Sequence, residues 1–302
     1  MKWKKIGKIY CASGEKKWMM HAAMCPVAVQ LSTHVFRIYF TARDEQLRGR
    51  VASLEIDMRK PLDYFNLTLN PLLDLGRTGT FDDSGVVTSS IANINGIRHL
   101  YYMGMSLGKT VPFYVWPGLA KENPDGTFTR VLECPVFGRS ASEPLCNASN
   151  FVLSDNGHYR MWYLSIRYWK DAKHYYHIRH AESSDGINWI PSDIACIDFA
   201  APTEYAIARP CVIHDPDGYK MWFCSRSLYG VDSYRIRYAE SADGLHWTRK
   251  DREVGIDVSP EGWDSEMICY PDLFDYMGKR YMLYNGNGYG RTGFGLAVLE
   301  DE

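Results

Sequence analysis

The chain has 302 residues, 34 of them basic and 36 acidic, which gives a formal net charge of −2 at pH 7. Because no run of like charge stands out, we expect neither a nucleic acid nor an anionic membrane as the main partner. No apolar stretch approaches the length of a membrane span, and no apolar signal segment follows the basic N-terminus. These features predict a cytoplasmic protein without a membrane span.

The eight cysteines are scattered singly, without a C-x-x-C pair. A zinc site or a disulfide framework would need tighter spacing, so we expect reduced thiols, several of them packed as small core residues. His174, His177 and His180 are spaced by three, which does not place them on one face of a strand. The sequence therefore predicts no metal and no other cofactor.

An aromatic-rich strand recurs five times along the chain. Its core occupies residues 38–40, 100–102, 161–163, 221–223 and 282–284, so the interval is 60 to 62 residues. A fixed period of this length, filled with short strands, is typical of a propeller in which each repeat forms one four-stranded blade. Since no repeat can bury its apolar faces without its neighbours, we expect an all-β fold in which residues 1–302 form a single five-bladed β-propeller domain.

The two ends of the chain are expected to complete one blade together. The fifth repeat stops after its third strand, and the stretch that begins at Trp3 is similar to the one that begins at Trp247, after an Asp-Gly turn. Asp-Gly is a strong hairpin signal. We expect an N-terminal strand over residues 3–9 to close the last blade beside residues 294–299, which would protect an open sheet edge.

An isolated polar residue precedes each aromatic strand by about seventeen positions. In chain order these residues are His21, Asp82, Glu143, Glu204 and Glu266. They lie just before the innermost strand of each predicted blade, so we expect their side chains to converge on one central funnel. Carboxylates that share a funnel raise one another's pKa and can divide into proton donor and acceptor, as glycosidic-bond cleavage requires. The alternative is that these groups cap strand ends or bind a structural water molecule.

Further polar and aromatic residues are candidates for substrate binding. Arg209 and Tyr270 each lie twelve residues before an aromatic core, where a cation and a phenol could hold a carboxylate, a phosphate or a sugar hydroxyl. Arg209 could instead pair with a neighbouring acid. Trp263, beside an acidic pair, is the candidate platform for a sugar ring. The predicted substrate-binding set is His21, Arg209, Tyr205, Trp263, Asp264 and Tyr270.

With its repeat, its aromatic strands and its two Ser-x-Asp-Gly-x-x-Trp turns, the chain resembles the five-bladed propeller glycosidases. These comprise glycoside hydrolase families 32, 43, 62 and 68 and the related family 130 phosphorylases. The resemblance implies an Asp in front of blade 1, an Asp in front of blade 3 and a Glu in front of blade 4. Glu204 matches the last of these, the general acid, whereas Glu143 replaces the blade 3 Asp and His21 replaces the blade 1 Asp.

The resemblance implies a glycoside-processing enzyme, a hydrolase or phosphorylase, that uses carboxylates in the central funnel on an intracellular sugar conjugate or oligosaccharide. Glu204 would be the proton donor and Glu143 would orient it, while an acid of blade 2 or blade 5 would replace the missing blade 1 carboxylate. The predicted catalytic set is Glu204, Glu143, Asp83, Asp82 and Glu266. Two alternatives stay open: a glycosyl-transferring enzyme in which Arg209 holds an anionic group, and a carbohydrate-binding propeller without catalysis. The sequence makes no prediction of the sugar, the linkage or the oligomeric state.

Overall fold

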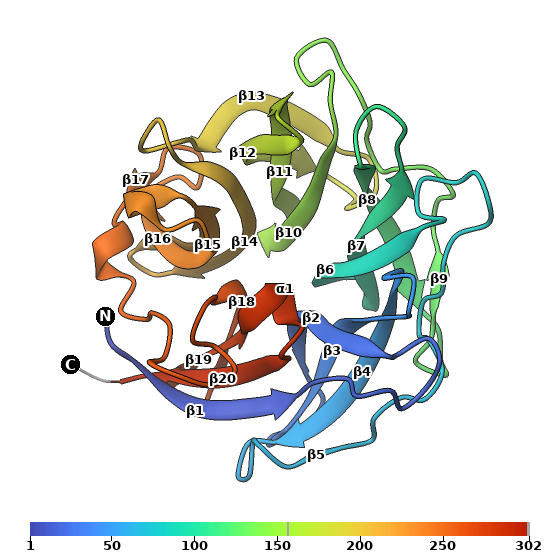
Figure 1. The fold of residues 1–302 in the computed structure, drawn as a ribbon, viewed down its shortest axis with the longest axis vertical. Coiled ribbons are helices and arrows are strands. Elements are labelled where there is room, and N and C mark those ends of the chain that lie inside the picture. Colours follow the sequence, from blue (N-terminus) through green and yellow to red (C-terminus); the bar gives the residue numbers. More distant parts are fainter. Residues whose placement is uncertain (156, 301–302) are drawn as a thin grey trace.

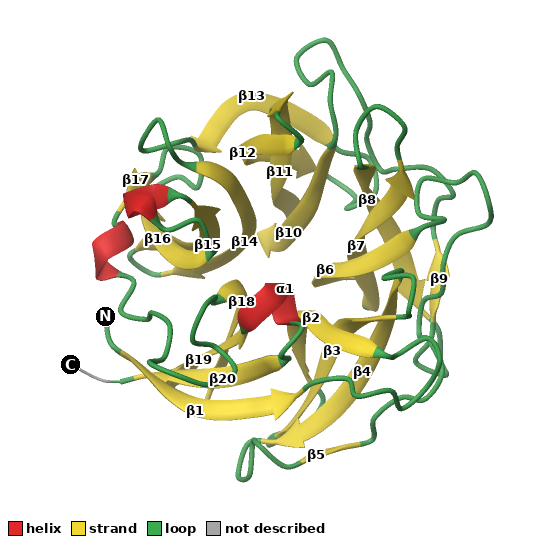
Figure 2. Cartoon of the chain, viewed as in Figure 1, coloured by secondary structure: helices red, strands yellow, loops and turns green. Residues whose placement is uncertain are grey.

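The computed structural model describes residues 1–155 and 157–300, and strands dominate it (Figure 2). Five four-stranded antiparallel sheets are arranged around a central axis (Figure 1). The helical elements of the described residues are short: η1 (Leu228–Gly230), η2 (Asp251–Glu253) and α1 (Asn287–Gly290). None of these described helices has the length and apolar character needed to cross a membrane. The predicted all-β, five-bladed propeller is confirmed.

In blades 1 to 4 the strands follow one another outward from the axis in chain order. In blade 5 the outermost strand is β1, from the N-terminus. Blades 1 and 2 contain β2 (His21–Gln30), β3 (Val35–Arg43), β4 (Gly49–Asp57) and β5 (Tyr64–Phe65), then β6 (Gly85–Ile94), β7 (Ile97–Leu107), β8 (Phe113–Glu122) and β9 (Phe128–Arg130). Blades 3 and 4 contain β10 (Asn147–Asp155), β11 (His158–Lys170), β12 (Lys173–Ser183) and β13 (Ile190–Ile197), then β14 (Tyr205–Asp215), β15 (Gly218–Arg226), β16 (Arg235–Ser241) and β17 (Thr248–Arg249). Blade 5 contains β18 (Cys269–Tyr276), β19 (Lys279–Asn285), β20 (Phe294–Leu299) and the N-terminal β1 (Trp3–Tyr10).

The N-terminal strand closes the last blade, as predicted. β1 pairs antiparallel with β20, with Trp3 opposite Leu299 and Tyr10 opposite Phe294. The N-terminus and the end of β20 accordingly lie near one another at the edge of blade 5 (Figure 1). Pairing satisfies the backbone groups that β20 would otherwise leave open at the edge of the sheet.

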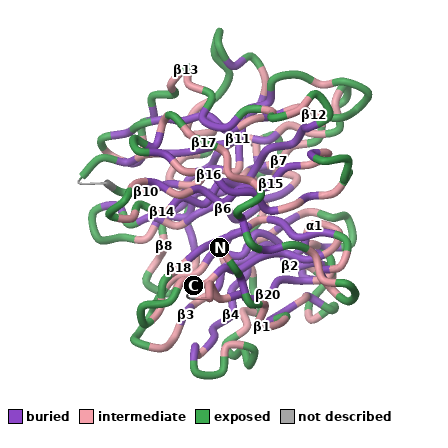
Figure 3. The backbone as a smooth tube through the Cα atoms, turned by 90° about the vertical axis from the view of Figure 1, so that its left-hand side faces the viewer, coloured by how far each residue is buried: buried purple, intermediate pink, exposed green. Residues whose placement is uncertain are grey.

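The second strands of the blades form the core. Their aromatic segments are fully buried, and buried residues follow the strands whereas exposed ones follow the loops (Figure 3). The Ser-x-Asp-Gly-x-x-Trp turn adds a link between neighbouring blades. Ser183 Oγ accepts a hydrogen bond from the Gly186 N–H (2.9 Å), and the Gly186 carbonyl accepts one from Tyr101 of the preceding blade. Gly186 has a φ of 72°, a conformation that favours glycine. This motif is therefore part of the scaffold.

Candidate active site

The five inner strands surround a cavity of about 340 Å³ at the centre of the propeller. Every blade contributes an inner-strand residue to its lining: Cys25, Ser89, Ser149, Ala208 and Tyr270. Each inner strand also has a register irregularity near this point. Cys25, Ser149 and Tyr270 adopt positive φ values of 51°, 51° and 56° there. Because a bulge re-aims side chains, these irregularities account for residues that turn toward the axis.

One side of the cavity, formed by blades 4 and 5, is cationic and aromatic. Arg226, the last residue of β15, donates from Nη1 to the hydroxyl of Tyr289 on α1 (2.7 Å). Its guanidinium group lies 5.2 Å from the ring centre of Tyr205 and 5.8 Å from that of Tyr234. Asp232 pairs with Arg226 from the rim (3.1 Å), where its side chain is half exposed. No described residue accepts a hydrogen bond from the buried Nε of Arg226.

A second arginine reaches the cavity from blade 1. Arg43 is the last residue of β3, and its side chain lines the cavity. No described residue accepts a hydrogen bond from its buried Nε, and the next carboxylate along the chain, Asp44, pairs with Arg48 and Arg50 instead. Among the described residues that line the cavity there is neither Asp nor Glu. The lining therefore carries two guanidinium groups without a carboxylate between them, which suits an anionic ligand.

The opposite side of the cavity, formed by blades 2 and 3, is apolar. Its apolar residues are Val87, Met103, Met105, Phe113, Val115, Leu164 and Ile166, and Thr88, Ser89 and Ser149 of the same blades also line the cavity. His174 on β12 joins this side, with its ring stacked on Tyr176 at 4.9 Å. Burial lowers the pKa of His174 to about 4, and the charge of Arg226 acts in the same direction. The imidazole is therefore neutral at pH 7, and its buried Nδ1 has no hydrogen-bond partner among the described residues.

Arg209 is a buried cation beside the cavity lining. It is 2% exposed, and its guanidinium group donates to the carbonyls of Thr88 (3.2 Å), Ser89 and Pro26 (3.3 Å) on blades 1 and 2. Its Nη1 and Nη2 atoms are thus engaged by backbone oxygens. Nearby, burial raises the pKa of Asp272 to about 6, although the charge of Arg209 opposes this shift. Arg209 thus contacts the backbone of two lining residues, Thr88 and Ser89, but it is not itself among the described residues that line the cavity.

The acids at the repeated polar position are anchored within their own blades. In blade 2, Asp82 accepts hydrogen bonds from the Tyr102 hydroxyl (2.9 Å) and from Arg130 Nε (2.7 Å). In blade 3, Glu143 accepts a hydrogen bond from the Tyr163 hydroxyl (2.7 Å), and an arginine of β12 lies 3.5 Å away. Both carboxylates are buried. The phenol comes from the second strand of the blade and the cation from an outer strand.

Blade 5 repeats this arrangement, whereas the acid of blade 4 has a cation but no phenol as its partner among the described residues. Glu204 receives two hydrogen bonds of 2.8 Å from Arg249 on β17. Asp264 receives hydrogen bonds from Lys5 on β1 (2.7 Å) and from the Tyr284 hydroxyl (3.0 Å). Asp82 and Glu143 each lie twenty residues before the tyrosine that they bind, and in blade 5 Asp264 lies twenty residues before Tyr284. Asp264 is thus their counterpart. The corresponding position in blade 1 is Met20. These carboxylates tie the segment before each inner strand to the outer part of its blade.

The five predicted side chains are not among the described residues that line this cavity. Asp82, Glu143 and Glu204 are buried in contacts within their own blades, and His21 and Glu266 are exposed. Asp83 accepts hydrogen bonds from the Gly79 N–H and the Ser84 hydroxyl. A catalytic role stays a prediction for Glu204, Glu143, Asp83, Asp82 and Glu266.

Of the predicted substrate-binding residues, the structure brings two to the cavity region. Tyr270 lines the cavity, and the Tyr205 ring lies under Arg226. Trp263 instead stacks on Tyr284 at 5.1 Å inside blade 5. His21 and Asp264 lie elsewhere, as described above.

Sequence reasoning missed the two cavity arginines, although the repeat contains the signal. Arg43 and Arg226 are both the fifth residue after the first position of the aromatic core, that is, after residues 38 and 221. The same position holds Met105 in blade 2 and Ile166 in blade 3, which also line the cavity. This repeat position therefore supplies a cavity arginine in blades 1 and 4 and an apolar cavity residue in blades 2 and 3.

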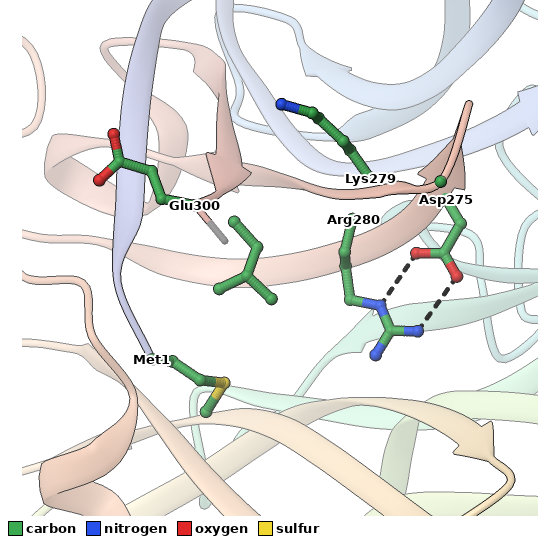
Figure 4. Close-up of a pocket in the computed structure, with 7 residues that line it drawn as sticks. Met1, Asp275, Lys279, Arg280 and Glu300 are labelled. Carbon is green, nitrogen blue, oxygen red and sulfur yellow. Dashed lines mark hydrogen bonds and ion pairs between the residues drawn. The ribbon is translucent and has the colours of Figure 1, made fainter. Parts of the chain in front are cut away.

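A second hollow of about 420 Å³ lies on the outside of blade 5, beside the chain ends. It is lined by Met1, Lys279, Arg280, Asp275 and Glu300, among others (Figure 4). Arg280 donates to Asp275 (2.9 and 3.1 Å) and to Asp215 (2.8 Å twice), so its guanidinium group is already engaged by two carboxylates. No cluster of His, Cys, Asp and Glu in the described part of the chain has the arrangement of a metal site. The central cavity is therefore the better candidate site.

Two proteins of Mycobacterium tuberculosis are similar to this chain over its whole length. They carry the names Uncharacterized protein Rv1502 (strain H37Rv) and Uncharacterized protein MT1551 (strain CDC 1551). Each is 41% identical over 303 residues, which covers 100% of both chains. The chain belongs to the family of these two proteins. No family model matches it.

Solved structures with the same fold are glycoside hydrolases. A thermostable family-43 glycoside hydrolase has a TM-score of 0.72 at 14% identity, covering 94% of this chain and 91% of its own. A glycosyl hydrolase from Bacteroides ovatus has a TM-score of 0.70 at 16% identity, covering 99% and 90%. A structure from the family 130 mannoside phosphorylases, described as containing hydrolases that target β-1,2 mannosidic linkages in Candida mannan, has a TM-score of 0.69 at 15% identity, covering 99% and 90%. The resemblance to the five-bladed propeller glycosidases is confirmed for the fold.

Proposed function

We propose that the central cavity binds an anionic sugar or sugar conjugate and that the protein processes a glycoside of this class. The observation that carries this proposal is the pair of guanidinium groups, Arg43 and Arg226, in a lining that has no carboxylate among the described residues. Both arginines are partly buried, and the buried Nε of each lacks an acceptor among the described residues, although Arg226 also pairs with Asp232 at the rim. A phosphate or carboxylate in the cavity would satisfy these donors through charge-assisted hydrogen bonds.

The remaining lining fits a sugar next to the anionic group. Tyr234, Tyr270 and Tyr289 present amphipathic rings of the kind that pack against pyranose faces. A volume of about 340 Å³ lies at the small end of the range for ligand sites. It favours one sugar residue with its anionic substituent over a long polymer.

The charge of the cavity favours particular kinds of glycoside processing. In phosphorolysis an oxygen of inorganic phosphate forms the new bond to the anomeric carbon as the glycosidic bond breaks, so phosphate must be held beside the sugar. In glycosyl transfer from a phosphorylated donor, the phosphate is the leaving group. Both reactions need a cationic site, and both fit Arg43 and Arg226 better than hydrolysis by two carboxylates in the same cavity.

Binding without turnover is the second candidate function. One observation favours it: among the described lining residues there is no Asp or Glu that could act as proton donor or nucleophile. In that case the protein would be an anionic-carbohydrate-binding propeller.

Calorimetric titration with inorganic phosphate, glucose 1-phosphate, glucuronate and neutral glucose tests the proposal. We expect the anionic compounds to bind and glucose to bind at least tenfold more weakly, because it cannot pair with the arginines. Equal affinity for glucose and its anionic derivatives would contradict the proposal. Incubation of glycosides with and without phosphate, followed by NMR, then separates turnover from binding alone.

A further inference from the structure

A continuous apolar strip leads from the cavity to the surface. We define this apolar strip as Met103, Met105 and Leu107 of β7, Phe113 and Val115 of β8, and Leu164 and Ile166 of β11. All of these except Leu107 line the cavity.

Strand geometry explains why the strip is continuous. Alternate residues of a strand project from the same face, so Met103, Met105 and Leu107 follow one another along one side of β7. Met105 lies opposite Val115 and Leu107 lies opposite Phe113 in the register of β7 and β8. Leu107 is 76% exposed. The strip therefore begins inside the cavity and ends in solvent.

The chemistry of the strip differs from that of a sugar subsite. A sugar hydroxyl or a phosphate oxygen placed against thioether, isopropyl and phenyl groups would lose its water without gaining a hydrogen bond. The cationic side of the same cavity, with Arg43 and Arg226, has the opposite character. The two sides together match a ligand with an anionic end and an apolar end.

We propose that the ligand is an amphipathic sugar conjugate: an anionic sugar attached to a linear hydrocarbon chain, which lies along the apolar strip and leaves the cavity past Leu107. This inference rests on the proposed function, since it places the anionic end at the arginines. A chain is favoured over a compact aromatic group because the strip extends beyond the cavity to the exposed rim.

Titration with inorganic phosphate, butyl phosphate and octyl phosphate, each below its micelle-forming concentration, tests the inference. Octyl glucoside serves as the neutral control with the same chain. Because each buried methylene group contributes to affinity, we expect octyl phosphate to bind roughly tenfold to hundredfold more tightly than inorganic phosphate, with butyl phosphate between them. We expect octyl glucoside to bind at least tenfold more weakly than octyl phosphate.

Substitutions locate the chain on the strip. Leu107→Gln changes an exposed side chain and should leave folding intact. We expect it to reduce the ratio of octyl phosphate affinity to inorganic phosphate affinity at least threefold, without changing the affinity for inorganic phosphate. Ile190→Gln, at a residue that is 77% exposed on β13, is the matched control and should have no effect. Phosphate binding without chain-length dependence would overturn this inference and leave the proposed function standing. Equal affinity for octyl phosphate and octyl glucoside, or no binding of any probe, would overturn both.

Discussion

Arg43 and Arg226 occupy the same position in the repeats of blades 1 and 4, each at the end of the second strand, and both reach the central cavity. Their counterparts in blades 2 and 3 are Met105 and Ile166. A single repeat position thus divides the cavity into a cationic side and an apolar side. The same scaffold could change its ligand by changing only these side chains.

The ion pair between Glu204 and Arg249 should matter chiefly for stability. Arg249→Met leaves a buried carboxylate without its cation, and we expect the free energy of unfolding in urea to fall by about 3–5 kcal/mol. Arg249→Met combined with Glu204→Gln should recover part of this loss. Arg59→Gln, which removes an exposed ion pair with Asp57, is the control and should cost under about 1 kcal/mol. A loss below about 1 kcal/mol for Arg249→Met would contradict the anchoring role.

Proton donation by Glu204 stays a prediction, which Glu204→Gln tests separately. Because Glu204 does not line the cavity, we expect the folded variant to bind phosphate with unchanged affinity. A roughly 10²–10⁴-fold loss of turnover at unchanged affinity would support proton donation. Turnover at the wild-type rate by the folded variant would end that assignment.

Asp272 should make stability fall as the pH rises. Burial raises its pKa from the ordinary value to about 6 in the folded protein, so folding favours the protonated form. Its stabilising contribution is fully present below the unfolded pKa of about 3.9 and is lost as the pH rises through about 6. Asp272→Asn should remove this dependence and be the more stable protein at pH 7, by up to about 2–3 kcal/mol. Urea unfolding of both proteins between pH 4 and pH 7 measures it; parallel pH profiles would refute the assignment.

Closure of the propeller depends on β1. Trp3 is buried and its ring packs edge-on against Trp222 at 6.2 Å, while the neighbouring Lys4 is exposed. We expect Trp3→Ala to lower the free energy of unfolding by about 3–5 kcal/mol, because a large cavity forms between blades 4 and 5. Lys4→Ala should change it by less than about 0.5 kcal/mol. Similar effects of the two substitutions would show that closure contributes little.

Periodicity was enough to predict the fold, including the pairing of β1 with β20, because each blade repeats the same aromatic strand. It was not enough to predict the direction of the polar side chains. Asp82 and Glu143 precede the inner strands as expected, but Tyr102, Arg130 and Tyr163 hold them toward the outer strands. These partners lie 20 to 48 residues away in sequence, and their side-chain directions depend on packing between strands.

Tyr270 reaches the cavity because the inner strand is irregular at that point, and Arg43 does so from the end of a second strand. The alternation of residues along a regular strand does not predict that either side chain reaches the cavity. The cationic and apolar residues Arg43, Arg226, Met105 and Ile166 share the repeat position that follows the aromatic core. Overall composition and net charge do not single out this position.

The affinity of the Arg43→Gln variant for inorganic phosphate tests the central claim most directly. Gln keeps a polar but shorter side chain and removes the charge and the guanidinium fork, so we predict phosphate affinity about tenfold to hundredfold below that of the wild-type protein. Arg59→Gln, at an exposed arginine outside the cavity lining, should bind phosphate as the wild type does. Wild-type phosphate affinity in a folded Arg43→Gln protein would contradict an anion site at the centre of the propeller.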